Sequence, residues 1–374
     1  MRIGFTGELR DDAQIRAGFI GCGSHAFRNV YPTFQFAPVD LVAVCDLDAE
    51  RADAFASQFG AEAAYTDHRD MLERNDLDAV FIVVGYDDLG RPLYPSLAVD
   101  CLNAGKHVWF EKPPAATAAD IERIHAAATR AGKQAMVGFK KMFFPANEKA
   151  RRLSCDADFG AVMHVNTEYP QYVPTVGQFD RYFGGTRDLP TMFFLDHLCH
   201  PASNLLNLLG APATLSYERA RNGAASATLT YASGAIANLA LTWGAAAQDG
   251  LERTTIVGES NRHVVVDNNR RVTYHRMPYV EYGATPDFYA SGLDDTTLVW
   301  EPEFSLGQLY NKGIFLLGYV GEVTEFATAI IEGRAVAKAG MDDAWLVTHL
   351  FESFAKGPGE RIALQTQPPW CRDV

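Results

Sequence analysis

The chain has 374 residues, enough for two domains or one large one, and its 48% hydrophobic content is ordinary for a globular protein with a sizeable core. Acidic residues outnumber basic ones by 46 to 33, which gives a formal net charge of −13. This balance argues against nucleic acid as the main partner, because phosphate contacts need clustered lysine and arginine side chains.

The first third of the chain predicts alternating strands and helices. Five apolar runs predict strands, at 17–20, 41–45, 79–84, 107–110 and 135–137. Three segments between them have apolar residues at the three-to-four spacing of amphipathic helices, at 50–59, 93–103 and 118–131. Strands that are apolar on both faces and are separated by helices indicate βαβ units and a parallel sheet.

The pattern changes near Gly138. Alternating apolar and polar residues predict longer strands of a sheet with one covered face, at 161–169, 213–217, 225–231, 235–243 and 254–257. Helices are expected at 202–209, 321–332 and 341–354, and long loops at 170–190 and 277–305.

No targeting or membrane segment is expected. The first residues, MRIGFTGELRDDAQ, carry charges where a signal peptide needs an apolar stretch, and no run reaches the ~18 apolar residues of a membrane span. The six cysteines include no CxxC pair, which is typical of reduced, buried thiols. A cytoplasmic location is therefore predicted, and residues 1–15 are interpreted as an extension of unknown role.

The first predicted strand of the sheet runs into GCGSHA, which fits the GxGxxG/A motif for dinucleotide phosphates. Gly21 permits the tight turn, Gly23 lets the pyrophosphate approach the backbone, and the small Ala26 lets the helix pack on the strand. Ser24 and His25 lie where the helix begins, and the free N–H groups there favour an anion.

A second signal for a dinucleotide lies at the end of the next predicted strand. Asp46 follows Ala26 by the spacing of about 20 residues that is expected for an acid binding the ribose hydroxyls. A carboxylate there repels a 2′-phosphate, and Leu47 offers no positive charge to hold one. The sequence therefore predicts NAD rather than NADP, with Arg51 interpreted as part of a solvated helix face.

These signals predict the fold class as an α/β Rossmann domain followed by an α+β domain with an open, largely antiparallel sheet. The predicted NAD-binding domain comprises residues 1–138. The predicted second domain, for substrate binding and oligomerisation, comprises residues 139–374.

Residues 104–114 read AGKHVWFEKPP, which resembles the AGKHV…EKP signature of the Gfo/Idh/MocA oxidoreductases, the family of glucose–fructose oxidoreductase and inositol dehydrogenase. The similarity extends over GFIGCGSHA, LVAVCDLDAERA, MVGF followed by a basic pair, and GEVTEFATAIIEGR. The resemblance implies an N-terminal Rossmann domain that binds NAD. It also implies a second domain whose open sheet holds the substrate and builds homo-oligomers.

Lys112 and Pro113 match the lysine–proline pair of this family. The resemblance implies that Pro113 shapes the nicotinamide site and that Lys112 contacts the reacting hydroxyl or carbonyl. A lysine in a partly dry cleft is expected to have a lowered pKa and to accept a proton, and as a cation it polarises an oxygen. Glu111 is interpreted as an orienting or nicotinamide-pocket residue, and Gly85 as a further cofactor contact after its strand.

Asp196 and His200 match the aspartate–histidine motif of the family's second domain. Residues four apart share one face of a helix, so both side chains are expected to point at one substrate, with His200 as proton acceptor. Ser203 departs from the family pattern, and Pro201 is expected in the first helical turn or at a kink. No metal is predicted, because the neighbouring histidine and cysteine point apart on a helix.

Seven further residues are candidates for substrate contact: Lys140, Lys141, Tyr94, Tyr169, Tyr172, Arg181 and Tyr182. Tyr94 replaces a family histidine, and the loop before it, with Tyr86, either borders the substrate or is solvated. Two adjacent lysines near Lys112 suggest a basic cleft for an anionic group on a sugar. The alternative is one inward lysine and one solvated lysine, and each aromatic residue either stacks on a sugar or packs in the core.

Three functions fit these signals. The first is an NAD-dependent oxidoreductase that takes hydride from a secondary alcohol of a sugar or cyclitol. The second is an NAD-dependent glycoside hydrolase acting by transient oxidation, elimination, hydration and re-reduction, on an anionic glycoside such as a sulfosugar or uronide. The third, a non-catalytic NAD-binding regulator, ranks last because Lys112 and His200 are both present.

Overall fold

The computed structural model describes residues 13–245, 251–276, 296–302 and 312–371. Residues 1–12 of the predicted extension and most of the predicted loop at 277–305 lie outside these ranges. No helix in the described ranges is long and apolar enough to cross a membrane.

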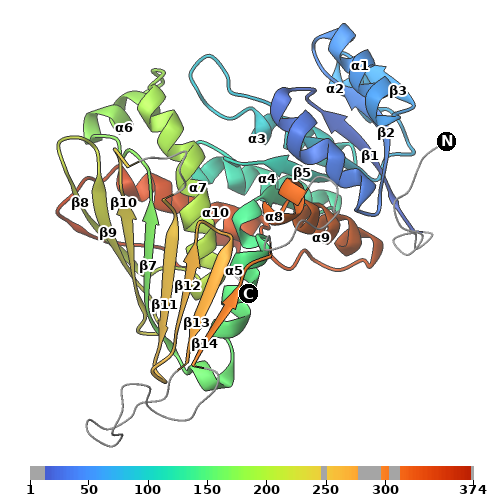
Figure 1. The fold of residues 1–374 in the computed structure, drawn as a ribbon. Helices are drawn as coiled ribbons and strands as arrows, with labels where there is room; N and C mark the ends of the chain where they lie inside the picture. The colour runs from blue at the N-terminus through green and yellow to red at the C-terminus, as the bar shows by residue number, and fades with distance from the viewer. Residues whose placement is uncertain (1–12, 246–250, 277–295, 303–311, 372–374) are drawn as a thin grey trace, which may run out of the picture.

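The first part of the chain forms a parallel six-stranded sheet with the order β3-β2-β1-β4-β5-β6 (Figure 1). Its strands are β1 (Ile15–Ile20), β2 (Val39–Cys45), β3 (Ala63–Tyr65), β4 (Ala79–Ile82), β5 (His107–Glu111) and β6 (Ala135–Gly138). The chain order reverses between β1 and β4, and in such sheets a dinucleotide binds outside the carboxyl ends of the strands at this point. The predicted Rossmann sheet is confirmed.

Three helices of this layer follow the expected periodicity, α1 (Ala49–Phe59), α3 (Tyr94–Asn103) and α4 (Ala118–Ala131). The sequence pattern did not predict the short helix α2 (His68–Leu72) or the short strand β3 before it. The helix that follows the glycine turn is irregular, because it is π-helical over Ala26–Val30 and 3-10 over Tyr31–Gln35.

The second sheet has nine strands in the order β14-β13-β12-β11-β7-β10-β9-β8-β15. Their bounds are β7 (Val162–Tyr169), β8 (Thr214–Arg219), β9 (Ala225–Thr230), β10 (Ile236–Leu241), β11 (Arg253–Gly258), β12 (His263–Asp267), β13 (Arg271–His275), β14 (Thr297–Trp300) and β15 (Arg361–Ala363). Among the described strand pairs of this second sheet, only β7 and β10 run parallel to each other. The predicted open, largely antiparallel sheet is confirmed.

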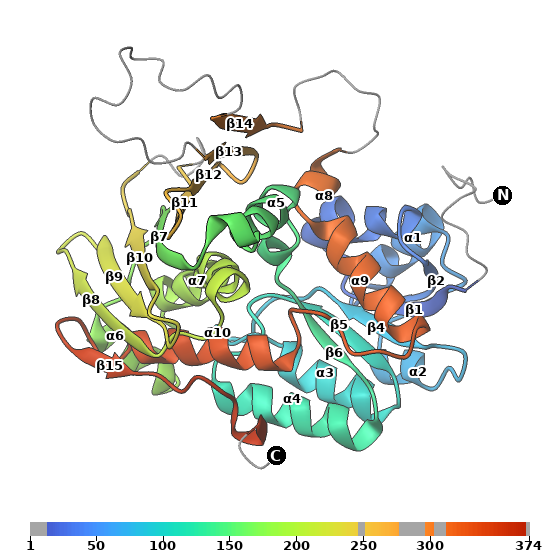
Figure 2. The same ribbon diagram turned by 90° about the horizontal axis from the view of Figure 1, so that it is seen from below.

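Helices cover one face of this second sheet and leave the other open (Figure 2). The covering helices are α5 (Pro145–Ser154), α7 (Leu189–Leu209) and α10 (Met341–Phe354). The chain returns to the first sheet through α8 (Lys312–Leu316) and α9 (Tyr319–Ile331), where Phe326 packs edge-on against Phe81 of β4 at 5.5 Å between ring centroids. Helix α10 also contacts α4 and β6 of the first layer, which joins the two parts of the molecule.

The predicted long loop at 170–190 is wrong. Helix α6 (Val176–Phe183) lies within it, and a capping box between Thr175 and Gln178 starts that helix. Helix α7 begins at Leu189, well before the expected start at 202, and Pro201 lies in its interior rather than in the first turn. Aromatic, proline and glycine residues hid the helical period in this stretch, and tertiary packing overrides their weak propensity.

Candidate active site

The turn after β1 leaves space for a pyrophosphate. Gly21 has φ +105°, and a Cβ on it would lie 1.9 Å from the backbone oxygen of Val83. At Gly23 nothing lies within 4 Å of a Cβ position, so the backbone there is open to a ligand. This shape fits the phosphates of a dinucleotide, as the glycine motif predicts.

Asp46 is fixed at the end of β2. Its carboxylate accepts hydrogen bonds from the backbone N–H groups of Cys22 at 2.8 Å and Asp48 at 3.0 Å. Arg51 Nη1 lies 3.7 Å from Asp46 Oδ1, so this arginine borders the acid as well as the solvent. An acid held beside the glycine turn fits the ribose hydroxyls of NAD, and the residues present therefore fit this cofactor.

Replacing Asp46 with alanine is expected to weaken NADH binding by about 10–100-fold, because hydrogen bonds to a charged acceptor contribute ~1.5–3 kcal/mol. NADPH binding should weaken much less, since a negative charge that repels its 2′-phosphate is also lost. Fluorescence titration with each dinucleotide measures both effects, and Asp53→Ala, on the exposed face of α1, is the matched control. Equal weakening for NADH and NADPH would contradict a discriminating role.

Glu111 and His25 form a pair at the end of β5. His25 Nε2 lies 2.9 Å from Glu111 Oε1, and Glu111 Oε2 accepts from the backbone N–H of Lys112 at 2.9 Å. Burial raises the pKa of Glu111, but the hydrogen bond and charge of His25 and the charge of Lys112 outweigh it, so the pKa is lowered. The peptide bond between Lys112 and Pro113 is cis. The side chain of His25 therefore orients Glu111, while its backbone lies beside the glycine turn.

Lys112, which follows a strand of the first sheet, forms an ion pair with Asp196 on a helix that covers the second sheet. Lys112 Nζ donates to Asp196 Oδ1 at 2.8 Å, and the hydroxyl of Tyr86 donates to the same oxygen at 2.7 Å. Tyr86 and Lys112 follow strands β4 and β5 of the first sheet, whereas Asp196 lies on α7. Of the two alternatives for the loop after β4, the contact of Tyr86 supports the one in which the loop borders the site. Asp87 of the same loop instead accepts hydrogen bonds from backbone N–H groups of its own loop.

The expectation of a lowered pKa for Lys112 was wrong. Burial lowers the pKa of this ammonium, but the charges of Asp196 and Glu111 and the hydrogen bond to Asp196 outweigh it, so the pKa is raised. The pKa of Asp196 is lowered, because the charge of Lys112 outweighs the effect of burial. Lys112 is therefore held as a cation, and of its two expected roles this charge state suits polarising an oxygen rather than accepting a proton.

His200 lies one turn beyond Asp196 on the same helix, with its ring 6.3 Å from that of Tyr169. Burial and the charges of Lys112, Lys140 and Lys141 lower the pKa of His200 well below its usual value. His200 is therefore neutral at pH 7 and able to accept a proton.

The acid limb of kcat/KM is expected below pH 6.5, because the lowered pKa of His200 keeps the imidazole neutral until then. The unfolded chain binds a proton near pH 6.5 that the native chain does not, so the free energy of unfolding should fall as the pH drops below this value. His200→Gln should remove this part of the pH dependence. A pH–rate profile with urea titrations checks both, and an acid limb at or above pH 6.5 would contradict the assignment.

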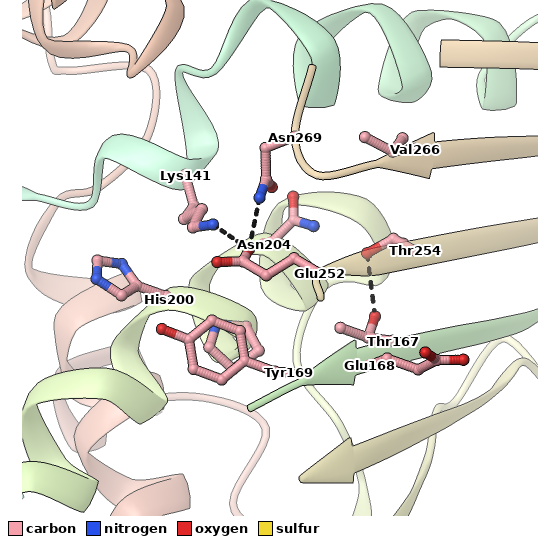
Figure 3. A pocket seen from close by; sticks show the side chains of 11 residues that line it. Lys141, Thr167, Glu168, Tyr169, His200, Asn204, Glu252, Thr254, Val266 and Asn269 are labelled. Atoms are coloured by element: carbon pink, nitrogen blue, oxygen red, sulfur yellow. Dashed lines mark hydrogen bonds and ion pairs between the residues drawn. The ribbon is translucent and has the colours of Figure 1, made fainter. Parts of the chain in front are cut away.

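A small pocket, partly open to solvent, extends from His200 along the covered face of the second sheet. Figure 3 shows Lys141 and Asn269 directed at Glu252 on its far side. Tyr169 closes the pocket near His200, and Asn204 lies on its floor one turn further along α7. This is where the structure brings predicted substrate residues together.

The two lysines after β6 do not form a free basic pair. Lys141 pairs with Glu252, and Lys140 Nζ donates to the hydroxyl of Tyr319 at 2.9 Å. Both side chains point inward, so neither the paired basic cleft nor the alternative with one solvated lysine describes them. Glu252 lies 111 residues beyond Lys141, and no local signal in the sequence marks that contact.

Four predicted substrate residues do not line this pocket. Tyr94 is buried and its hydroxyl donates to Val84 O at 2.7 Å, and Tyr182 is buried with its hydroxyl donating to Gly90 O at 3.2 Å. Tyr172 bonds Gln178, and Arg181 pairs with Asp188 at 2.7 Å at the start of α7. Gly85 lies exposed at the carboxyl end of β4 with open space at its Cβ position.

No group of three or more histidine, cysteine, aspartate or glutamate side chains in the described ranges could hold a metal ion. Asp196 points at Lys112, and His197 Nδ1 lies 2.9 Å from the backbone oxygen of Phe193. Burial raises the pKa of the Cys199 thiol, which disfavours the thiolate that a metal needs.

A Rossmann sheet with an open glycine turn and an acid held beside it, facing an ammonium–carboxylate pair, is typical of the class of NAD-binding oxidoreductases. Residues 15–139 match the model of the oxidoreductase family with an NAD-binding Rossmann fold, and residues 147–263 match the GFO/IDH/MocA C-terminal domain. The chain belongs to the Gfo/Idh/MocA oxidoreductase family.

Individual relatives agree with this placement. Inositol 2-dehydrogenase of Salmonella typhimurium is 34% identical over 134 residues, which are 34% of this chain and 38% of that protein. A dehydrogenase structure from Chromobacterium violaceum matches with a TM-score of 0.74 and 22% identity over 92% of this chain and 96% of the other. Levoglucosan dehydrogenase in complex with NADH and levoglucosan matches with a TM-score of 0.71 and 16% identity, over 94% and 100%. These two structures support the fold alone.

Proposed function

We propose that the protein is an NAD-dependent dehydrogenase that oxidises a secondary alcohol of a sugar or cyclitol. The observation that carries this proposal is the Lys112–Asp196 ion pair with a neutral His200 one turn away, opposite the cofactor end of the first sheet. The names of the relatives, an inositol 2-dehydrogenase and a levoglucosan dehydrogenase, support a polyhydroxylated substrate. Residues 1–138 would hold NAD and residues 139–374 the substrate.

The proposed chemistry divides between three side chains. Lys112 donates a hydrogen bond to the reacting hydroxyl oxygen and stabilises the negative charge that develops there. His200 accepts the hydroxyl proton, and Asp196 holds the Lys112 ammonium in place together with Tyr86. Bound NAD supplies the hydride acceptor, so the alcohol carbon loses a hydride and becomes a carbonyl carbon.

The contribution of the other predicted site residues follows from their positions. Gly21, Gly23, Ser24, His25 and Ala26 would cradle the pyrophosphate through the backbone, and Asp46 would bind the ribose. Glu111, Pro113 and Gly85 would border the nicotinamide. Tyr169 and Lys141 would contact the substrate, whereas Lys140 would act through Tyr319.

A panel assay with NAD tests this function. The purified protein is supplied with myo-inositol, levoglucosan, D-glucose, D-glucuronate and an aryl glucuronide, and NADH formation is followed by absorbance. Stoichiometric NADH from a free polyol is the expected result. Aglycone release without net NADH would instead identify the glycoside hydrolase, which no observation in the structure favours. NAD binding without turnover of any compound would identify the regulator.

The protein is further proposed to be a cytoplasmic homo-oligomer. All six cysteines lie within the described ranges and all are free, which suits a reducing compartment. The uncovered face of the second sheet is the surface through which copies would associate (Figure 2). Light scattering tests the assembly, and a monomer at micromolar concentration would contradict it.

A further inference from the structure

The far end of the pocket beyond His200 is built from a closed set of polar contacts. Lys141 is only 5% exposed and pairs with Glu252, and Asn269 Nδ2 donates to Glu252 at 2.5 Å. Lys141 comes from the turn after β6, Glu252 from the residue before β11 and Asn269 from the turn between β12 and β13 (Figure 3). Three separate elements therefore converge on one carboxylate.

The ion pair places one positive and one negative charge side by side at this end of the pocket. Burial lowers the pKa of Lys141 more than the charge and hydrogen bond of Glu252 raise it, so the pKa is lowered and Glu252 is the group that favours the charged ammonium. Asn204, Thr167 and Thr254 add neutral amide and hydroxyl groups to this wall. Glu168 also lines the pocket, and Figure 3 shows its carboxylate directed away from Glu252. An anion in this part of the pocket would find the Lys141 ammonium already paired with Glu252, and the carboxylate of Glu252 would repel it.

One polar atom in the pocket lacks a partner. Asn204 is 5% exposed, and its Oδ1 atom is buried with no hydrogen bond to any described residue. A carboxamide oxygen accepts hydrogen bonds and cannot donate them. A hydroxyl or an amine of a ligand would satisfy this oxygen, whereas a carboxylate or phosphate oxygen would repel it.

We propose that Glu252 is a specificity-determining residue. Because it neutralises Lys141, the pocket selects the uncharged, hydroxyl-bearing end of a polyol. A substrate with a carboxylate or phosphate at the same place binds less tightly. This inference rests on the proposed function. It replaces the anion-binding cleft that the adjacent lysines suggested with a site for neutral hydroxyl groups. Glu252 thus determines which substrate charge the pocket accepts, and it takes no part in hydride transfer.

The test compares matched neutral and anionic ligands. NADH-bound wild-type protein is titrated with D-glucose and D-glucuronate, and with D-galactose and D-galacturonate, and NADH fluorescence reports binding. The wild type should bind each neutral sugar at least about tenfold more tightly than its acid, because the acid would place a charge beside Glu252. A preference for the acids would overturn the proposal without any variant.

Glu252→Gln leaves the Lys141 ammonium unpaired. The ratio of acid to neutral affinity should rise at least about tenfold, and inorganic sulfate should raise the Tm of this variant more than that of the wild type at constant ionic strength. The double variant with Lys141→Met should lose both gains, because no ammonium remains. Glu218→Gln, exposed on β8, makes the same charge change remotely and should behave as wild type.

Unchanged ligand ratios and sulfate response in a folded Glu252→Gln variant would overturn the proposal. Equal gains in Glu252→Gln and in the double variant would also overturn it, since the effect would not need Lys141. Failure of the dehydrogenase function appears separately, as absent NADH formation with every polyol. The sulfate arm depends on no sugar, so the two failures are distinguishable.

Discussion

Replacing Lys112 with methionine is expected to lower kcat for NADH formation by about 10²–10⁴-fold, with NAD affinity close to that of the wild type. Lys112 Nζ lies 2.8 Å from Asp196 Oδ1, in the space between the cofactor edge and His200. Methionine fills a similar volume but donates no hydrogen bond and carries no charge. The developing negative charge on the substrate oxygen then loses its main stabilising group.

Steady-state kinetics on the substrate found in the panel, with NADH titration for cofactor affinity, checks this expectation. Lys356→Met is the matched control, because Lys356 is exposed after α10 and should leave both quantities unchanged. Lys112→Arg keeps the charge and should retain more activity than Lys112→Met, although the longer side chain shifts the donor. Turnover of Lys112→Met at the wild-type rate would remove Lys112 from the mechanism.

Replacing Gly21 with alanine is expected to reduce the free energy of unfolding by about 2–5 kcal/mol. A non-glycine residue at φ +105° costs about 1–2 kcal/mol, and overpacking in a well-packed region costs about 1–3 kcal/mol more. The added Cβ would lie 1.9 Å from Val83 O, which is backbone at the end of β4 and cannot rotate away. The turn would have to open, and NAD affinity should fall with it.

Gly23→Ala separates folding from binding at the same turn. Nothing lies within 4 Å of its Cβ position, so the variant should unfold at nearly the wild-type urea concentration. NAD affinity should still fall, because the methyl group occupies the space of the pyrophosphate. Urea titrations and NADH titrations on both variants check the pair. A stable Gly21→Ala protein would contradict the geometric argument.

Local sequence patterns predicted the first sheet well, because its strands are short apolar runs between helices with clear caps. Thr117 accepts a hydrogen bond from the backbone of Asp120 at the start of α4, and Gly132 ends that helix at φ +62°. Both signals lie within the segment itself. The predicted bounds of α4 therefore agree with the structure to the residue.

The predictions about the charged groups of the site had a different difficulty, because these groups depend on contacts between distant parts of the chain. Tyr86 bonds Asp196, 110 residues away, and Lys141 bonds Glu252, 111 residues away. Adjacent lysines predict a basic cleft only if no carboxylate reaches them, and the sequence cannot show which carboxylate does. The raised pKa of Lys112 arises in the same way, because Asp196 lies on another element.

The single carboxylate oxygen of Asp196 that binds both Lys112 and Tyr86 links the geometry of the cleft to its proton chemistry. Lys112 and Tyr86 follow strands of the first sheet, whereas Asp196 lies on α7. Separating these two parts of the molecule would pull both donors from the same atom. Lys112 would then lose its counter-charge and its burial together, and its raised pKa would return toward that of a solvated lysine. Closing the cleft and raising the pKa of Lys112 are therefore thermodynamically linked.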